Sequence, residues 1–124
     1  MATALDRASL DPLERRTLER FVEMLRERLG EELVAVWLYG SRARGEEPHP
    51  ESDVDLIVIT RGGERDRKTT IAAVWDAAEV EGSNPFNFSA HTFDPEYVED
   101  RRAIESFYIQ EVDRDKIVMY GSAL

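Results

Sequence analysis

The chain lacks cysteine and any long apolar run. Its 124 residues include no cysteine, which excludes disulfides, thiolate nucleophiles, iron–sulfur clusters and cysteine-based zinc sites. The longest apolar run, Leu33–Tyr39, is far too short to span a bilayer. The first residues are interrupted at once by charged side chains and do not resemble a signal segment. We therefore expect a cytoplasmic protein that does not enter a membrane.

Positive charge is also scarce. The chain has 16 Lys and Arg against 26 Asp and Glu, a formal net charge of −10 at pH 7. This balance disfavours binding to nucleic acid or to anionic membrane. A small anionic ligand stays open if a metal ion accompanies it, because the metal changes the local sign of charge. The length and the 42% hydrophobic content predict one globular domain over residues 1–124, with residues 1–10 as a short flexible arm.

Apolar periodicity predicts the order αββαβαβ. The segment Asp11-Pro12-Leu13-Glu14 has the cap, proline and acid that typically begin a helix. Seven elements are expected: helix 12–29, strands 33–39 and 54–60, helix 66–81, strand 86–93, a helix from 95 to about 111, and strand 116–120. This order predicts an α+β (mixed α/β) fold with a small mixed sheet of about four strands and helices packed on one face.

Two aspartates begin the second predicted strand. Asp53 and Asp55 are two residues apart, so their side chains point to the same face. Two neighbouring carboxylates resist joint ionisation unless a cation lies between them. Oxygen ligands suit Mg²⁺ or Mn²⁺, so the pair predicts a metal site.

A candidate phosphate site follows the first predicted strand, in the sequence Gly40-Ser41-Arg42-Ala43-Arg44. Gly40 allows a ligand to approach the backbone, and the Ser41 hydroxyl can donate a hydrogen bond to phosphate. Arg42 and Arg44 could add charge-assisted hydrogen bonds. A phosphate site beside a metal-binding pair is what phosphoryl or nucleotidyl transfer requires.

These residues resemble the nucleotidyltransferase superfamily related to DNA polymerase β, and within it the minimal nucleotidyltransferase (MNT) group. The resemblance rests on Leu38-Tyr39-Gly40-Ser41, then eleven residues, then Asp53-Val54-Asp55-Leu56-Ile57. It implies a polymerase β-like palm fold and an NTP substrate, ATP above all. It also implies that Asp53 and Asp55 hold the metal and triphosphate, and that Gly40 and Ser41 bind the β and γ phosphates.

One position departs from that family. Active members carry a third carboxylate on a later strand, between two apolar residues. The best match in this chain is Asn87, within Phe86-Asn87-Phe88. An amide forms hydrogen bonds but takes no proton at neutral pH. Ser89 and His91 share that strand face if the strand is regular. His91 could act as a base, but it lies roughly 13 Å further along.

The resemblance also implies a partner. Larger relatives carry an extra helical domain that helps to hold the acceptor, and we expect none within these 124 residues. In the MNT group the partner is often a small all-helical HEPN protein, and the antitoxin transfers AMP to a tyrosine of that toxin. Three hypotheses stay open. The chain could transfer a nucleotide to a hydroxyl of a partner protein, or it could be a weak or inactive nucleotide-binding antitoxin that acts by complex formation. It could also be a small-molecule nucleotidyltransferase that works as a homodimer.

Overall fold

The computed structural model describes residues 4–49 and 53–124. Its helices are α1 (Pro12–Leu29), α2 (Gly40–Ala43), α3 (Arg67–Glu81), α4 (Pro95–Ala103) and α5 (Phe107–Asp115). Its strands are β1 (Leu33–Tyr39), β2 (Val54–Thr60), β3 (Phe88–Phe93) and β4 (Ile117–Gly121). Short 3₁₀ turns lie at η1 (Ala4–Arg7), η2 (Gly30–Glu32), η3 (Gly63–Asp66) and η4 (Pro85–Asn87).

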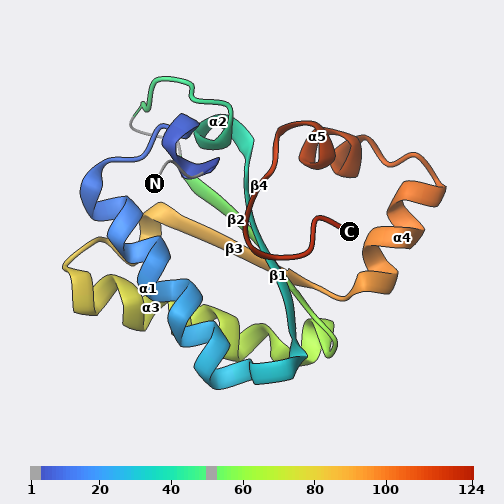
Figure 1. Cartoon of the computed structure of the whole chain (residues 1–124), viewed down its shortest axis with the longest axis horizontal. Helices are drawn as coiled ribbons and strands as arrows, with labels where there is room; N and C mark the ends of the chain where they lie inside the picture. Colours follow the sequence, from blue (N-terminus) through green and yellow to red (C-terminus); the bar gives the residue numbers. More distant parts are fainter. Residues whose placement is uncertain (1–3, 50–52) are drawn as a thin grey trace.

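The four strands form one mixed sheet in the order β3-β2-β1-β4. β1 is antiparallel to both β2 and β4, whereas β2 and β3 run parallel. The parallel pair is possible because α3 connects the end of β2 to the start of β3 (Figure 1). The predicted α+β fold with a mixed sheet of four strands is confirmed.

Helices cover both faces of the sheet, so the prediction that they pack on one face is wrong. β2 explains how this occurs, because its side chains alternate between the faces. Val54, Leu56 and Val58 join the core formed with α1 and α3. Ile57 and Ile59 join a second core with Trp37, Val98 and Val112, the last two from α4 and α5. In Figure 1 the two helix pairs lie on opposite sides of the strands. Asp55, between Leu56 and Val54, belongs to the α4–α5 face.

The start of α1 follows its sequence signals. The Asp11 side chain accepts a hydrogen bond from the Glu14 amide at 2.7 Å, and Glu14 Oε1 accepts one from the Asp11 amide at 3.0 Å. This capping box confirms the predicted helix start. Residues 4–10 differ from the predicted arm, because η1 is ordered against the core and Leu5, Ala8 and Leu10 pack on it. Residues 1–3 of that arm lie outside the described residues.

The predicted helix 95–111 is two helices. α4 ends at Ala103, Glu105 adopts φ 53°, and α5 begins at Phe107. The break turns Ile104 and Phe107 outward, where they are 68% and 75% exposed. Continuous helical spacing from residue 95 to about 111 predicts four inward-facing residues: Val98, Ile104, Phe107 and Tyr108. Of these, only Val98 is fully buried, and Tyr108 is partly buried.

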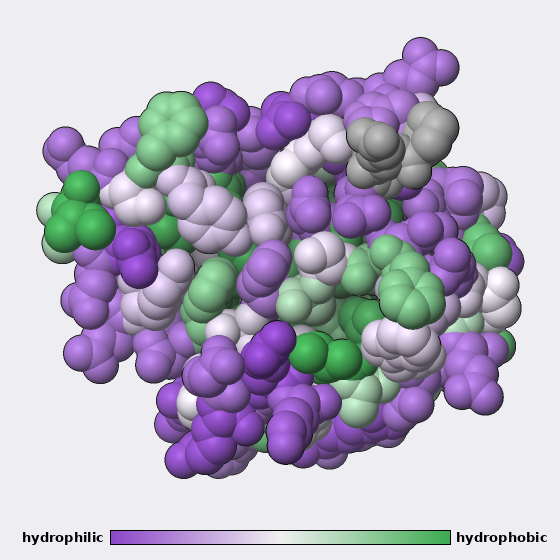
Figure 2. All heavy atoms as spheres, turned by 180° about the vertical axis from the view of Figure 1, so that it is seen from behind, coloured by the Kyte–Doolittle hydropathy of each residue, from purple (hydrophilic) through white to green (hydrophobic). Residues whose placement is uncertain are grey.

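α3 presents small residues to the sheet. Ala73, Ala77 and Ala78 are fully buried, whereas Ile71 and Trp75 are 37% and 45% exposed. Trp75 packs edge-to-face on Phe86, at 5.0 Å between ring centroids. Helical spacing predicts Ile71, Val74, Trp75 and Ala78 on one face of this helix, but only Val74 and Ala78 of these four are buried. Figure 2 shows separate apolar patches on a largely hydrophilic surface.

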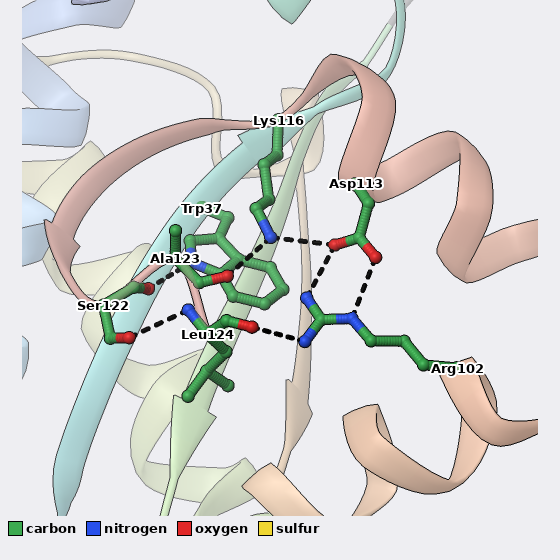
Figure 3. A network of polar contacts seen from close by, with 7 residues as sticks. All are labelled: Trp37, Arg102, Asp113, Lys116, Ser122, Ala123 and Leu124. Carbon is green, nitrogen blue, oxygen red and sulfur yellow. Dashed lines mark hydrogen bonds and ion pairs between the residues drawn. The ribbon is translucent and has the colours of Figure 1, made fainter.

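A polar network fixes α4 and α5 to β1 (Figure 3). Asp113 accepts hydrogen bonds from the Arg102 guanidinium at 2.8–2.9 Å and from Lys116 Nζ at 2.8 Å. Lys116 Nζ also lies 3.9 Å from the Trp37 ring centroid, and the Trp37 indole N–H donates to the Ser122 carbonyl. Trp37 is fully buried, as expected for a core residue. Across residues 4–49 and 53–124, none of the helices has both the length and the apolar content needed to cross a membrane.

Candidate active site

The two halves of the sequence motif meet at one end of the central strands. β1 ends at Tyr39 and continues directly into the single turn of α2. In the antiparallel register of β1 and β2, Tyr39 lies opposite Asp55. Gly40 follows the residue that is paired with Asp55, so the Gly-Ser and Asp-x-Asp segments are neighbours in space.

Gly40 approaches Asp55 more closely than any other residue type could. It adopts φ +78°, and a Cβ built on it would lie 2.6 Å from Asp55 Oδ2. Such a contact is far too short for a real Cβ, so the absence of a side chain permits this packing. Asp55 is half-buried, and Asp53 is exposed immediately before β2. The structure thus brings the α2 turn and the aspartate pair together, as the sequence predicts.

Asp55 is held in an environment that disfavours its charge. Burial raises the pKa of Asp55, and the nearby carboxylate of Asp53 raises this pKa further. His91, Arg42 and Arg44 act in the opposite direction. The net effect still raises the pKa of Asp55. A cation placed between the two ionised carboxylates would therefore stabilise them.

The donor set fits a hard divalent cation. Asp53 and Asp55 lie at the start of the central strand β2, where the charge of Asp53 is near enough to raise the pKa of Asp55. Mg²⁺ is commonly held by one or two carboxylates, with waters and substrate phosphates as its other ligands. Over the described part of the chain, no cluster of three or more His, Asp or Glu residues is placed to hold a metal. A metal at Asp53 and Asp55 would therefore take its further oxygen ligands from water and from the phosphates of the nucleotide.

The two arginines of the motif are engaged by acids of this chain. Arg42 is 6% exposed, and its Nη1 lies 2.8 Å from Glu14 Oε1. Arg44 pairs with Glu46 and, at 3.1 Å, with Asp115. The sequence predicted phosphate contacts for both residues, whereas the structure directs Arg42 toward α1 and Arg44 toward α5.

The third-carboxylate position differs from the sequence prediction. β3 begins at Phe88, so Asn87 is not a strand residue but the exposed last residue of η4. Ser89 is the residue in register with Asp55, and His91 is in register with Ile57. Strand alternation predicts Ser89 and His91 on one face, but it does not predict which residue lies beside Asp55, because strand register depends on long-range pairing.

A pair of tyrosines closes the side of the site next to α5. Tyr108 donates a hydrogen bond from its hydroxyl to that of Tyr39 at 3.0 Å, and the rings meet edge-to-face at 5.9 Å. Burial raises the pKa of both hydroxyls, so both stay protonated at neutral pH. The pair borders a small pocket of about 90 Å³, lined by Tyr39, Gly40, Arg44, Tyr108, Glu111, Val112 and Asp115. No local pattern in the sequence indicates that Tyr108 is a neighbour of Tyr39.

The family is shown by a match to the nucleotidyltransferase domain model over residues 18–114. This match covers well over half of the 124 residues and includes the α2 turn, both aspartates and all of α5 except its last residue. The chain belongs to the nucleotidyltransferase domain family. No curated protein sequence matches it.

Solved structures show the same fold. A mutant of the toxin–antitoxin complex MntA–HpeT matches with a TM-score of 0.54 and 17% identity, over 84% of this chain and 73% of that one. A toxin–antitoxin structure with AMP-PNP matches with a TM-score of 0.53 and 18% identity, over 84% and 73%. A tri-AMPylated HEPN toxin of Shewanella oneidensis in complex with its MNT antitoxin matches with a TM-score of 0.51 and 15% identity, over 87% and 72%. The predicted nucleotidyltransferase fold is confirmed.

Proposed function

We propose that this nucleotidyltransferase-family chain moves AMP from ATP to a hydroxyl of a partner protein, with Mg²⁺ or Mn²⁺ as cofactor. The observation that carries the proposal is the approach of Gly40 to the Asp55 carboxylate. This approach puts a turn suited to phosphate next to a pair of acids suited to a metal. Nucleotidyl transfer needs these two features together.

Each residue of the site has a distinct proposed role. Asp53 and Asp55 hold the divalent cation, which neutralises charge on the triphosphate and on the departing pyrophosphate when it is bound. Gly40 and Ser41 bind the β and γ phosphates, and the Ser41 hydroxyl donates a hydrogen bond to them. The acceptor oxygen attacks the α phosphorus, the bond from the α phosphorus to the bridging oxygen breaks, and the hydroxyl proton passes to water.

A protein acceptor is proposed because of the likeness to complexes of MNT antitoxins with HEPN toxins, one of which carries an AMPylated toxin. We therefore expect a small helical HEPN-type partner. A small-molecule acceptor held by a homodimer is the rival within the same chemistry. The two differ in whether the label from ATP ends on a protein.

A second candidate function is favoured by the third-carboxylate position. Neither Asn87 nor Ser89 has a carboxylate side chain, and His91 is in register with Ile57, not with Asp55. The chain would then be an antitoxin that binds nucleotide with little turnover and neutralises its partner by occlusion. Complex formation that needs neither ATP nor Asp53 would favour this function.

A transfer assay tests the proposal. Wild type and the double variant Asp53→Ala/Asp55→Ala are incubated with α-labelled ATP, Mg²⁺ and a lysate of the source organism. A labelled protein band that only wild type produces supports transfer to a protein. Transfer retained by the double variant, with both proteins folded by circular dichroism, contradicts the proposal. Labelled small molecules without a labelled band favour the homodimer hypothesis.

A further inference from the structure

The start of α1 is connected to the α2 turn by a buried set of polar contacts. The Ser9 amide donates to the Arg42 carbonyl at 2.9 Å, and Arg42 Nη1 donates to the Ser9 carbonyl at 3.0 Å. Arg42 Nη1 also donates to Glu14 Oε1 at 2.8 Å. These contacts join residues 28 and 33 positions apart in the sequence. Both the backbone and the side chain of Arg42 are thus held by the same segment.

Glu14 is itself held firmly. Its Oε1 accepts the Asp11 amide within the capping box and accepts Arg42 Nη1 at the same time. The side chains of Glu14 and Arg42 are only 11% and 7% exposed. A buried ion pair with such additional hydrogen bonds is strongly disrupted when one partner is removed, because an uncompensated charge remains. The capping box of α1 therefore supports the residue that follows Ser41.

We propose that Arg42 is a positioning residue for the phosphate-binding turn, braced by Glu14 and Ser9, and that it makes no contact with the nucleotide. The inference rests on the proposed function, because it assigns phosphate binding to Gly40 and Ser41. Arg42 lies in the same helical turn as these two residues, and its carbonyl also accepts the Gly45 amide at 3.2 Å. Fixing Arg42 at both ends fixes the course of residues 40–45.

The substitution Glu14→Gln distinguishes positioning from direct contact. If Arg42 braces the turn, the loss of the Glu14 charge weakens AMP-PNP·Mg²⁺ binding about tenfold, and Arg42→Met weakens it by a similar factor. The double variant is then no worse than either single variant, because both act through one connection. If Arg42 contacts phosphate, Glu14→Gln releases the guanidinium and leaves affinity equal or higher, which overturns the proposal. Glu19→Gln, an exposed acid on the same helix, is the matched control.

Hydrogen exchange supplies the second readout. The brace predicts faster exchange of the amides of residues 40–45 in Glu14→Gln than in wild type or Glu19→Gln. If the amides of residues 40–45 exchange at the same rate in Glu14→Gln as in wild type, the proposal is overturned, whether or not nucleotide binds. Should Glu14→Gln fail to fold, Glu14→Asp keeps the charge but shortens its reach and is expected to show the same two effects to a smaller degree. If wild type binds no AMP-PNP, the proposed function is contradicted. Hydrogen exchange in Glu14→Gln then still tests whether Glu14 and Arg42 hold the turn in place.

Discussion

The Cα of Gly40 faces the Asp55 carboxylate so closely that a Cβ would lie 2.6 Å from Oδ2. The contact joins residues from β2 and from the turn after β1, and it exists only because position 40 has no side chain. The packing of the metal pair therefore depends directly on the residue type in the phosphate turn. This dependence leads to the first prediction.

Gly40→Ala is expected to abolish detectable AMP-PNP·Mg²⁺ binding, because the new methyl group must displace Asp55. The positive φ of Gly40 adds a strain of about 1–3 kcal/mol to the folded state. Gly82→Ala is the matched control, since Gly82 has φ +83° but nothing within 4 Å of its Cβ position. Calorimetric titration and thermal melts should show similar destabilisation in both variants, with binding lost only at position 40. Equal binding in the two variants would contradict the prediction.

Asp55→Asn is expected to stabilise the metal-free protein at pH 7 and to remove the effect of Mg²⁺ on its melting temperature. The pKa of Asp55 is raised by burial and then by Asp53, so its ionisation costs stability as pH rises through that pKa. The asparagine variant should melt a few degrees higher at neutral pH, and the difference should close at a pH below the ordinary pKa of aspartate. Asp53→Asn, at an exposed position, should also remove the effect of Mg²⁺ on the melting temperature. It should raise the melting temperature of the metal-free protein less than Asp55→Asn does. A lower melting temperature for Asp55→Asn at pH 7 would show that Asp55 instead stabilises the fold.

Asp113→Asn is expected to destabilise the α4–α5 face in a pH-dependent way. The Arg102 hydrogen bonds, followed by Lys116, lower the pKa of Asp113. Its contribution is therefore present at neutral pH and is lost as pH falls through that lowered pKa. Because the pair is partly exposed, the expected loss is only about 0.5–1 kcal/mol at pH 7. Urea melts at pH 7 and at a pH well below the ordinary pKa of aspartate should show a smaller difference from wild type at the lower pH. Asp100→Asn, an exposed acid of α4, should match wild type at both.

Much of the fold could be predicted because its signals are local. The capping box at Asp11 and Glu14 and the two apolar strands give α1, β1 and β2 with their observed bounds. The break between α4 and α5 was missed because a non-glycine residue, Glu105, takes the positive φ. No glycine or proline marks that position, so the helical spacing appears continuous through it.

The site could be predicted in part for the same reason. Gly40, Ser41 and Asp55 are placed by strand ends, which the apolar pattern locates. The partner of Arg42 could not be predicted, because Glu14 is 28 residues away and already has a local role in the capping box. The neighbour of Asp55 on β3 could not be predicted either, because it depends on where β3 begins, and η4 delays that start until Phe88.

Ser89→Asp tests whether the third carboxylate is what limits turnover. Ser89 is in register with Asp55 on the parallel strand β3, so a carboxylate there would face the metal pair. The variant should melt lower than wild type without metal, because a third acid adds repulsion. Mn²⁺ should raise the melting temperature of the variant more than that of wild type. The variant should also transfer AMP at least about tenfold faster than wild type, since a positioned carboxylate can contribute 10²–10⁴-fold. Asn87→Asp, in the exposed turn η4, is the matched control and should change all three quantities less. A larger gain from Asn87→Asp would place the missing acid in the turn and contradict the register argument.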